Sequence, residues 1–292
     1  MAINYIKFIE SNFSIKNKEG QIVPFILWSV QDKYFIDIIN HYGKPLSGVR
    51  DIILKARKEG FSSLILAMFA TDFLIEDYPI ASMCISKNRE ETRMLFERAK
   101  FFINSALSKY RKTIDDICDT SNSNELVNKI NGARFWISTA GSKTAFRVES
   151  IQNLHFSEAA HFPDTDILTA KETIEGASQM VDQGIGRIFI ESTANGYGNY
   201  YQKLETRAHQ GNSSFRSVFY SALEHYSPNW LTEKEKGFTT KEMFLQEYPN
   251  TREEAYMSSG SKFFDTAGIK YLQNLQKEPM QQGNLNMYGE MI

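Results

Sequence analysis

Short apolar runs alternate with amphipathic stretches along most of this chain. The runs 49–56 and 80–86 are largely apolar, as in strands buried on both faces of a sheet, and the stretch 89–107 repeats apolar residues along one helical face. The expected strands are 49–56, 80–86, 134–140, 151–156, 186–192 and 215–220, and the expected helices are 62–76, 89–107 and 166–180. This alternation predicts an α/β fold with a mainly parallel sheet, helices on both faces, and binding residues at the carboxyl ends of the strands.

The pattern changes after about Tyr226. The segment 227–240 is polar and rich in turn-forming residues, a short helix is expected at 241–248, and the tail 272–292 carries many Gln and Asn residues without a strand pattern. We therefore expect an N-terminal segment at 1–47, a core at 48–225 and a C-terminal lid or linker segment at 226–292.

A glycine turn joins the first expected strand to the helix that follows it. The strand leads into Gly60, and the hydroxyl residues Ser62 and Ser63 come at the start of the apolar helix. Glycine lets the backbone approach an anion, and the N–H groups at a helix start point toward it. A hydroxyl at this place can hold Mg²⁺, so the segment is a candidate phosphate loop. An ordinary strand–turn–helix with surface charges accounts for the same residues.

The usual phosphate-loop pattern, G-x-x-x-x-G-K-[ST], is not met. Phe61 stands in the lysine position, so a positive charge must come from elsewhere, and Lys55 and Arg57 lie just upstream. The run GSKT at 141–144 imitates the end of a phosphate loop, but a loop rather than a long helix is expected after it. We interpret GSKT as unrelated to phosphate binding.

Two further strands end in polar residues. The strand 151–156 ends in Ser157 and Glu158, where a carboxylate can orient an attacking water, although Ser157 stands where an Mg²⁺-side Asp is often found. The strand 186–192 ends in a cluster that can sense a γ-phosphate: Ser192, Thr193 and Asn195. The alternatives are a Glu favoured by a helix dipole and an ordinary Asn-Gly turn.

Composition narrows the candidate functions without choosing one. Lys and Arg total 33 and Asp and Glu total 35, so the net charge of −2 gives no global attraction to nucleic acid, and DNA contact needs a local patch or an oligomer. Cys84 and Cys118 have no His or Cys neighbours at ligand spacing, so neither zinc nor a disulfide framework is expected. The N-terminus lacks a signal-peptide pattern, and the longest apolar run, 64–75, is too short to cross a membrane.

The order KARKEGFSS, LHFSEAA and ESTANG in one α/β chain resembles the large terminase family of tailed bacteriophages. The similarity covers about residues 20–265, because 23–31 resembles the adenine-reading segment and 247–265 resembles the segment that closes the ATPase domain. The resemblance implies a P-loop NTPase fold of the ASCE type with small N- and C-terminal subdomain segments. It also implies ATP and Mg²⁺ as cofactors.

The resemblance assigns roles to individual residues. Arg57 matches the displaced basic residue of the phosphate loop, Ser62 the Mg²⁺-side hydroxyl, and Glu158 the catalytic carboxylate, which also contacts Mg²⁺ partly through water. Arg147 falls near the place of an arginine finger that reaches a neighbouring subunit, although a surface loop position suits it equally. The implied nucleotide-binding residues are Gln31, Lys55, Arg57, Lys58, Glu59, Gly60, Phe61, Ser62 and Ser63, and the implied coupling residues are Ser192, Thr193 and Asn195.

The resemblance implies an ATP-hydrolysing motor that moves viral double-stranded DNA into procapsids. Its implied partners are DNA, a portal protein, a small terminase subunit and further copies of itself in a ring, in the cytoplasm of a bacterium that is infected or carries a prophage. The family usually adds a nuclease domain, but no cluster of acids follows Asp265, so we expect none in this chain. Two alternatives stay open: another nucleic-acid-remodelling ATPase of helicase type, and a catalytically weak docking protein.

Overall fold

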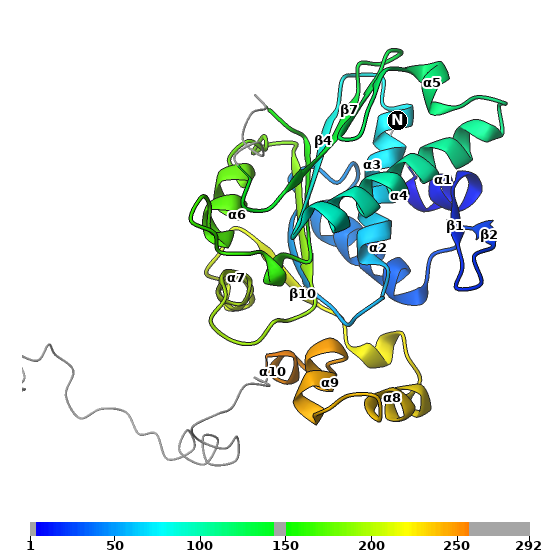
Figure 1. Ribbon diagram of the computed structural model, residues 1–292. Helices are drawn as coiled ribbons and strands as arrows, with labels where there is room; N and C mark the ends of the chain where they lie inside the picture. The colour runs from blue at the N-terminus through cyan, green and yellow to red at the C-terminus, as the bar shows by residue number, and fades with distance from the viewer. Residues whose placement is uncertain (1–3, 143–149, 257–292) are drawn as a thin grey trace, which may run out of the picture. The chain divides into compact units, whose positions relative to one another are not determined.

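The computed structural model describes residues 4–142 and 150–256 (Figure 1). Within these residues the centre is an eight-stranded sheet of order β10-β3-β9-β8-β4-β7-β6-β5. The strands from β10 to β7 in that order are parallel, and β6 and β5 are antiparallel additions at one edge. The bounds are β3 Arg50–Leu54, β4 Ala81–Ser86, β5 Cys118–Ser121, β6 Glu125–Asn128, β7 Arg134–Thr139, β8 Asn153–Ser157, β9 Arg187–Ser192 and β10 Arg216–Phe219.

Helices and one small hairpin surround this sheet. The hairpin consists of β1 Ser14–Lys16 and β2 Ile22–Pro24. The helices before β8 are α1 Tyr5–Asn12, α2 Ser29–Tyr42, α3 Phe61–Ile75, α4 Arg89–Ser108 and α5 Ile114–Ile117. Those after it are the 3₁₀ turn η2 Ala159–His161, α6 Ala170–Ser178, α7 Tyr200–His209, the 3₁₀ turn η3 Ala222–Glu224, α8 Pro228–Glu235, α9 Lys241–Glu247 and α10 Arg252–Ala255.

Two layers of helices cover the two faces of the sheet (Figure 1). Helices α1 to α4 share a core with Ile53 and Phe189 on one face, and α6 and α7 share a core with Ile52 and Ile190 on the other. Because successive side chains of a strand point to opposite faces, neighbouring residues of one strand serve different cores. Burial on both sides explains why these strands are apolar throughout.

Helix α3 is buried all round, which explains its nearly continuous apolar sequence. Every residue from 64 to 73 is fully buried between the sheet and the helices that cover it. Its one buried carboxylate, Asp72, forms an ion pair with Arg187 at the start of β9 and accepts hydrogen bonds from Tyr5 and Asn153 at 2.6 and 2.9 Å. This contact fixes α3, and therefore the loop before it, against the sheet.

The strands and helices expected between residues 49 and 220 are present, and the mainly parallel α/β architecture is confirmed. The helix expected at 166–180 begins later, at Ala170, because Thr169 and Glu172 form a capping box at its start. The antiparallel pair β5–β6 was not predicted, since each strand has only four residues and too few positions to show a period.

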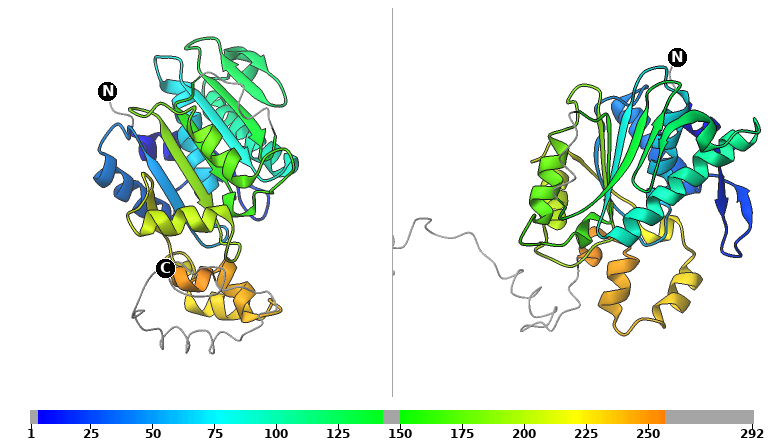
Figure 2. Two further views of the ribbon diagram at one scale, coloured as in Figure 1. Left: turned by 90° about the vertical axis from the view of Figure 1, so that its left-hand side faces the viewer. Right: turned by 45° about the horizontal axis from the view of Figure 1, so that its top comes forward.

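The segment 227–240, expected to be mainly turns, instead contains helix α8. Ser227 caps this helix and Pro228 opens its first turn. Leu231 packs with Phe244 and Tyr248 around Ala56, directly after β3. Figure 2 shows α8, α9 and α10 together beyond one end of the sheet. Helix α8 has one buried apolar residue, Leu231, and a single such residue gives no periodicity by which the sequence could indicate the helix.

No described helix is long and apolar enough to cross a membrane. The division of the chain into 1–47, 48–225 and 226–292 stays a prediction. Most of the tail assigned to the last segment lies outside the described residues.

Candidate nucleotide-binding site

The loop between β3 and α3, the predicted phosphate loop, contains a glycine with a left-handed backbone. Gly60 precedes the first residue of α3 with φ +76°, in the left-handed region. A Cβ atom at this position would lie 2.5 Å from Nε2 of Gln31, so a side chain cannot be accommodated without displacing Gln31. The loop therefore needs glycine for both its conformation and its packing.

Gln31 supports this loop from α2. Its Nε2 donates to the carbonyl oxygens of Glu59 and Gly60, at 3.3 and 3.0 Å, and its Oε1 accepts from the backbone N–H of Trp28 at 3.0 Å. Gln31 is 2% exposed. The base contact implied for Gln31 stays a prediction, and the structure shows that the same amide supports the predicted phosphate loop.

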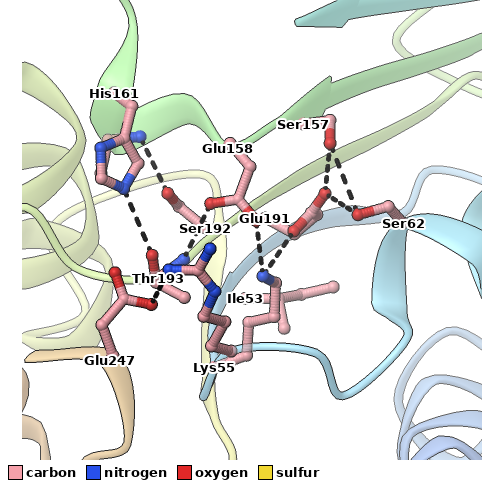
Figure 3. A network of polar contacts seen from close by, with 12 residues as sticks. Ile53, Lys55, Ser62, Ser157, Glu158, His161, Glu191, Ser192, Thr193 and Glu247 are labelled. Carbon is pink, nitrogen blue, oxygen red and sulfur yellow. Dashed lines mark hydrogen bonds and ion pairs between the residues drawn. The ribbon is translucent and has the colours of Figure 1, made fainter. Parts of the chain in front are cut away.

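Lys55 is the basic residue that faces the carboxylates (Figure 3). Its Nζ lies 2.9 Å from Oε1 of Glu158 and 3.2 Å from Oε2 of Glu191, and the side chain is almost fully buried. Burial alone would lower the pKa of Lys55, but the two carboxylates outweigh burial and raise that pKa above its ordinary value. Lys55 therefore carries a fixed positive charge at the end of β3.

Arg57, the basic residue favoured by the resemblance, has a different partner. Its guanidinium lies 3.1 Å from Oε2 of Glu247 on α9, and its side chain is 55% exposed. The role implied for Arg57 stays a prediction, but Lys55 is the residue that pairs with Glu158. The two basic residues are two positions apart, and the path of the loop alone separates their directions.

Glu158 lies directly after β8 and joins two strand ends. Its backbone is left-handed, with φ +57°, and its Oε2 accepts from the N–H of Thr193 at 3.4 Å. Its other oxygen, Oε1, accepts a hydrogen bond from Lys55, so the carboxylate is oriented from both sides. This puts the predicted catalytic carboxylate and the predicted phosphate loop at the same place.

The residues with an implied coupling role all contact the turn after β8. Ser192 Oγ accepts from the N–H of Ala160 at 3.1 Å, and Nδ2 of Asn195 donates to the carbonyl of Ala160 at 3.0 Å. Thr193 Oγ1 lies 3.2 Å from Nε2 of His161 (Figure 3). The end of β9 is thus tied to the segment that carries Glu158, although the coupling role itself stays a prediction.

Glu191 is a site residue that sequence reasoning missed. It is fully buried on β9, between β3 and β8, and its Oε1 accepts from Ser62 Oγ and Ser157 Oγ, each at 2.7 Å. The available signal was a Glu at the end of an apolar strand, because a buried charge needs partners. Its partners lie on α3 and β8, far away in the sequence, so no local pattern could identify them.

The other predicted nucleotide-binding residues of the loop differ in their contacts and in their exposure. Phe61 is fully buried and stacks on Tyr220, with ring centres 5.3 Å apart, so it contributes packing in place of a lysine charge. Ser63 Oγ accepts from Arg98 at 3.0 Å, whereas the side chain of Lys58 is exposed. Arg147 and part of the GSKT run lie outside the described residues.

Glu59 is fully buried within the loop. Burial raises its pKa from 4.5 to about 8, against the opposing effect of Lys55. The carboxyl group is therefore mostly protonated at pH 7, which removes a negative charge from the loop that would bind phosphate.

A protonated Glu59 makes stability depend on pH. Because its pKa is raised on folding, the free energy of unfolding is expected to fall as pH rises from about 4.5 toward 8, by up to roughly 1.4 kcal/mol per pH unit, and to fall no further from this group above that range. Urea unfolding between pH 5 and 9 measures this. Glu59→Gln should flatten the profile, and an unchanged profile in that variant would assign the slope to another group.

The oxygen atoms at the site suit Mg²⁺. Ser62 supplies a hydroxyl, and Glu158 and Glu191 supply carboxylates. Mg²⁺ in nucleotide sites is held by one or two such groups together with phosphate oxygens and water. Among the described residues, no group of three or more His, Cys, Asp or Glu side chains could hold a metal ion.

Solved structures of phage large terminases have a fold similar to that of this chain. No family model matches the chain, and no curated protein matches its sequence. The HK97 bacteriophage large terminase is similar at 18% identity with a TM-score of 0.57, over 87% of this chain and 48% of that one. The ATPase domain of the Thermus phage P74-26 large terminase is similar at 14% identity and TM-score 0.53, over 72% and 91%.

A third similar structure contains a nucleotide. It is a large terminase from a thermophilic bacteriophage in complex with ADP, with 10% identity and a TM-score of 0.52, over 77% of this chain and 53% of that one. The fold is therefore of the P-loop ATPase class. More particularly, it is the fold of the ATPase domains of phage large terminases, as the sequence resemblance implied. The chain spans about half the length of the HK97 protein and of the protein crystallised with ADP.

Proposed function

We propose that this chain is the ATP-hydrolysing motor domain of a phage large terminase, which moves double-stranded DNA into procapsids. The observation that carries the proposal is the convergence of the Gly60 turn, Lys55 and Glu158 at the carboxyl ends of neighbouring parallel strands. Nucleotides bind at that edge in open α/β sheets. The similarity in fold to large terminases, one of them with ADP, supports the same conclusion.

The residues of the site have complementary roles in this proposal. Lys55 and the N–H groups at the start of α3 bind the β- and γ-phosphates, and Ser62 and Glu158 would hold Mg²⁺, Glu158 partly through water. Mg²⁺, when bound, neutralises charge on the phosphates. Phosphate oxygens compete with Glu158 for the ammonium of Lys55, which frees the Glu158 carboxylate to accept a hydrogen bond from the attacking water.

Loss of the γ-phosphate reverses this exchange. Glu158 regains Lys55, and the change reaches β9 through the hydrogen bonds that join Thr193 to Glu158 and Ser192 to Ala160. Helix α7 begins a few residues after β9, so the segment between them passes the change to a DNA-contacting surface. The end of β9 is then a mechanical link between hydrolysis and movement.

The remaining parts of the proposal concern assembly. Copies of the chain form a ring on the procapsid with a portal protein and a small terminase subunit, and Arg147 of one copy completes the site of the next. The net charge of −2 then requires DNA to be held by pooled local patches of several copies. The protein works in the bacterial cytoplasm.

Three assays with the full chain separate this function from its alternatives. Mg²⁺-dependent ATP hydrolysis is expected, stimulated by double-stranded DNA, together with no separation of a labelled duplex. Efficient strand separation would favour a helicase-like remodeller. Calorimetry that detects no binding of Mg-ATP would instead favour a docking protein that retained only the fold.

A further inference from the structure

The last residue of β8 lacks the second negative charge that phosphate-loop enzymes often place next to the catalytic carboxylate, on the metal side of the site. Ser157 occupies the position where an Asp is expected, and a hydroxyl carries no charge. In the adjacent parallel strand β9, Glu191 lies directly opposite Ser157 in the register. A carboxylate therefore stands at the same level of the sheet, one strand nearer to the phosphate loop.

The two oxygen atoms of Glu191 contact the loop and the end of β8 at the same time. Oε1 accepts from Ser62 Oγ and from Ser157 Oγ, each at 2.7 Å, and lies 3.2 Å from Nε2 of His155. Oε2 lies 3.2 Å from Nζ of Lys55 (Figure 3). Glu191 thus accepts a hydrogen bond from the very hydroxyl that is proposed to bind Mg²⁺.

The carboxylate group of Glu191 is fully buried. A buried carboxylate needs polar partners, and Glu191 has the ammonium of Lys55 and the hydroxyls of Ser62 and Ser157 within 3.2 Å. The residues before it on β9, Ile188 to Ile190, are apolar and fill the two cores. Packing alone gives no reason for a charged side chain at this place, where only its polar contacts stabilise it.

We propose that Glu191 takes the place of the missing strand-end aspartate: it orients the Ser62 hydroxyl toward Mg²⁺ and supplies the negative charge of the outer coordination shell. Its action passes through Ser62, so Glu191 is a positioning residue. The inference rests on the proposed function, because it needs a Mg-nucleotide at the site. Groups that orient metal ligands in this way typically change metal affinity by about 10–100-fold.

A purely structural role would produce a different result. If Glu191 only balanced the charge of Lys55, its loss would lower stability without nucleotide and would leave the benefit of Mg²⁺ unchanged. The distinguishing quantity is the magnesium gain, defined here as the ratio of the affinities for AMP-PNP, a non-hydrolysable ATP analogue, with and without Mg²⁺. Isothermal titration calorimetry on the full chain measures it.

Four proteins make the comparison: the parent, E191Q, the double variant S157D/E191Q and the control E205Q. Glu205 is also a buried carboxylate, 2% exposed, and pairs with Arg252 and Ser217 away from the site. E191Q is expected to lower the magnesium gain by about 10–100-fold, and S157D/E191Q to restore it to within about threefold of the parent. E205Q is expected to keep the parent gain.

Folding is checked by thermal melting. If E191Q does not fold, S157D/E191Q carries the test, because it returns a carboxylate to the strand position directly opposite residue 191. Three results would overturn the inference and leave the proposed function standing. The first is an E191Q protein with the magnesium gain of the parent, and the second is a double variant that fails to fold or to recover that gain. The third is an equal loss of the gain in E205Q. A parent protein that binds no AMP-PNP with Mg²⁺ would overturn the proposed function, and the inference with it.

Discussion

Lys55→Ala is expected to weaken ATP binding by roughly 30-fold or more, since loss of one partner of a buried, charge-assisted contact costs about 2–5 kcal/mol. Lys55 supplies the positive charge that Phe61 does not, and its Nζ is held 2.9 Å from Glu158. The same change leaves Glu191 buried without its cation, so the free energy of unfolding should fall by about 3–5 kcal/mol. Calorimetric titration and urea unfolding measure the two effects.

Arg57→Ala is the matched control for this prediction. Arg57 pairs with Glu247 at the surface and is 55% exposed, so its loss should change stability by only about 0–1 kcal/mol. ATP affinity should change by less than about tenfold. If Arg57→Ala removed ATP binding and Lys55→Ala did not, the displaced basic residue of the loop would be Arg57, as the sequence resemblance implies.

Glu158→Gln is expected to lower kcat by about 10²–10⁴-fold while ATP affinity stays within about tenfold. The amide keeps the shape of the side chain but cannot accept a proton from water. Lys55 keeps Glu191 as a partner, so the site should stay folded. Steady-state hydrolysis and calorimetric titration of the same preparation separate the two quantities.

Asp164→Asn is the control for Glu158, because Asp164 is the next acid along the chain. Its Oδ1 accepts from the N–H of Ala170 at 2.8 Å, at the start of α6, so its role is structural. This variant should hydrolyse ATP at the parent rate. Undiminished turnover in Glu158→Gln, or a large loss in Asp164→Asn, would discard the assignment of Glu158 as the catalytic carboxylate.

The sequence by itself determined the type and order of most helices and strands. It also identified the polar residues that follow β3, β8 and β9. Apolar runs, helical periods and the glycine turn are local signals, and they correctly indicated β3, α3, β4, α4, β8 and β9. Gly60, Ser62 and Glu158 could be chosen because phosphate chemistry requires such residues at the ends of parallel strands. Helix α8 was missed because one apolar anchor does not make a period.

Only the tertiary structure decided which charges meet. Lys55 and Arg57 are two positions apart, and the path of the loop sends one to Glu158 and the other to Glu247. Glu191 contacts Ser62 because β9 lies between β3 and β8, an order that no local pattern contains. Side-chain periods are encoded within each strand, whereas strand order and loop path depend on packing between segments far apart in the chain.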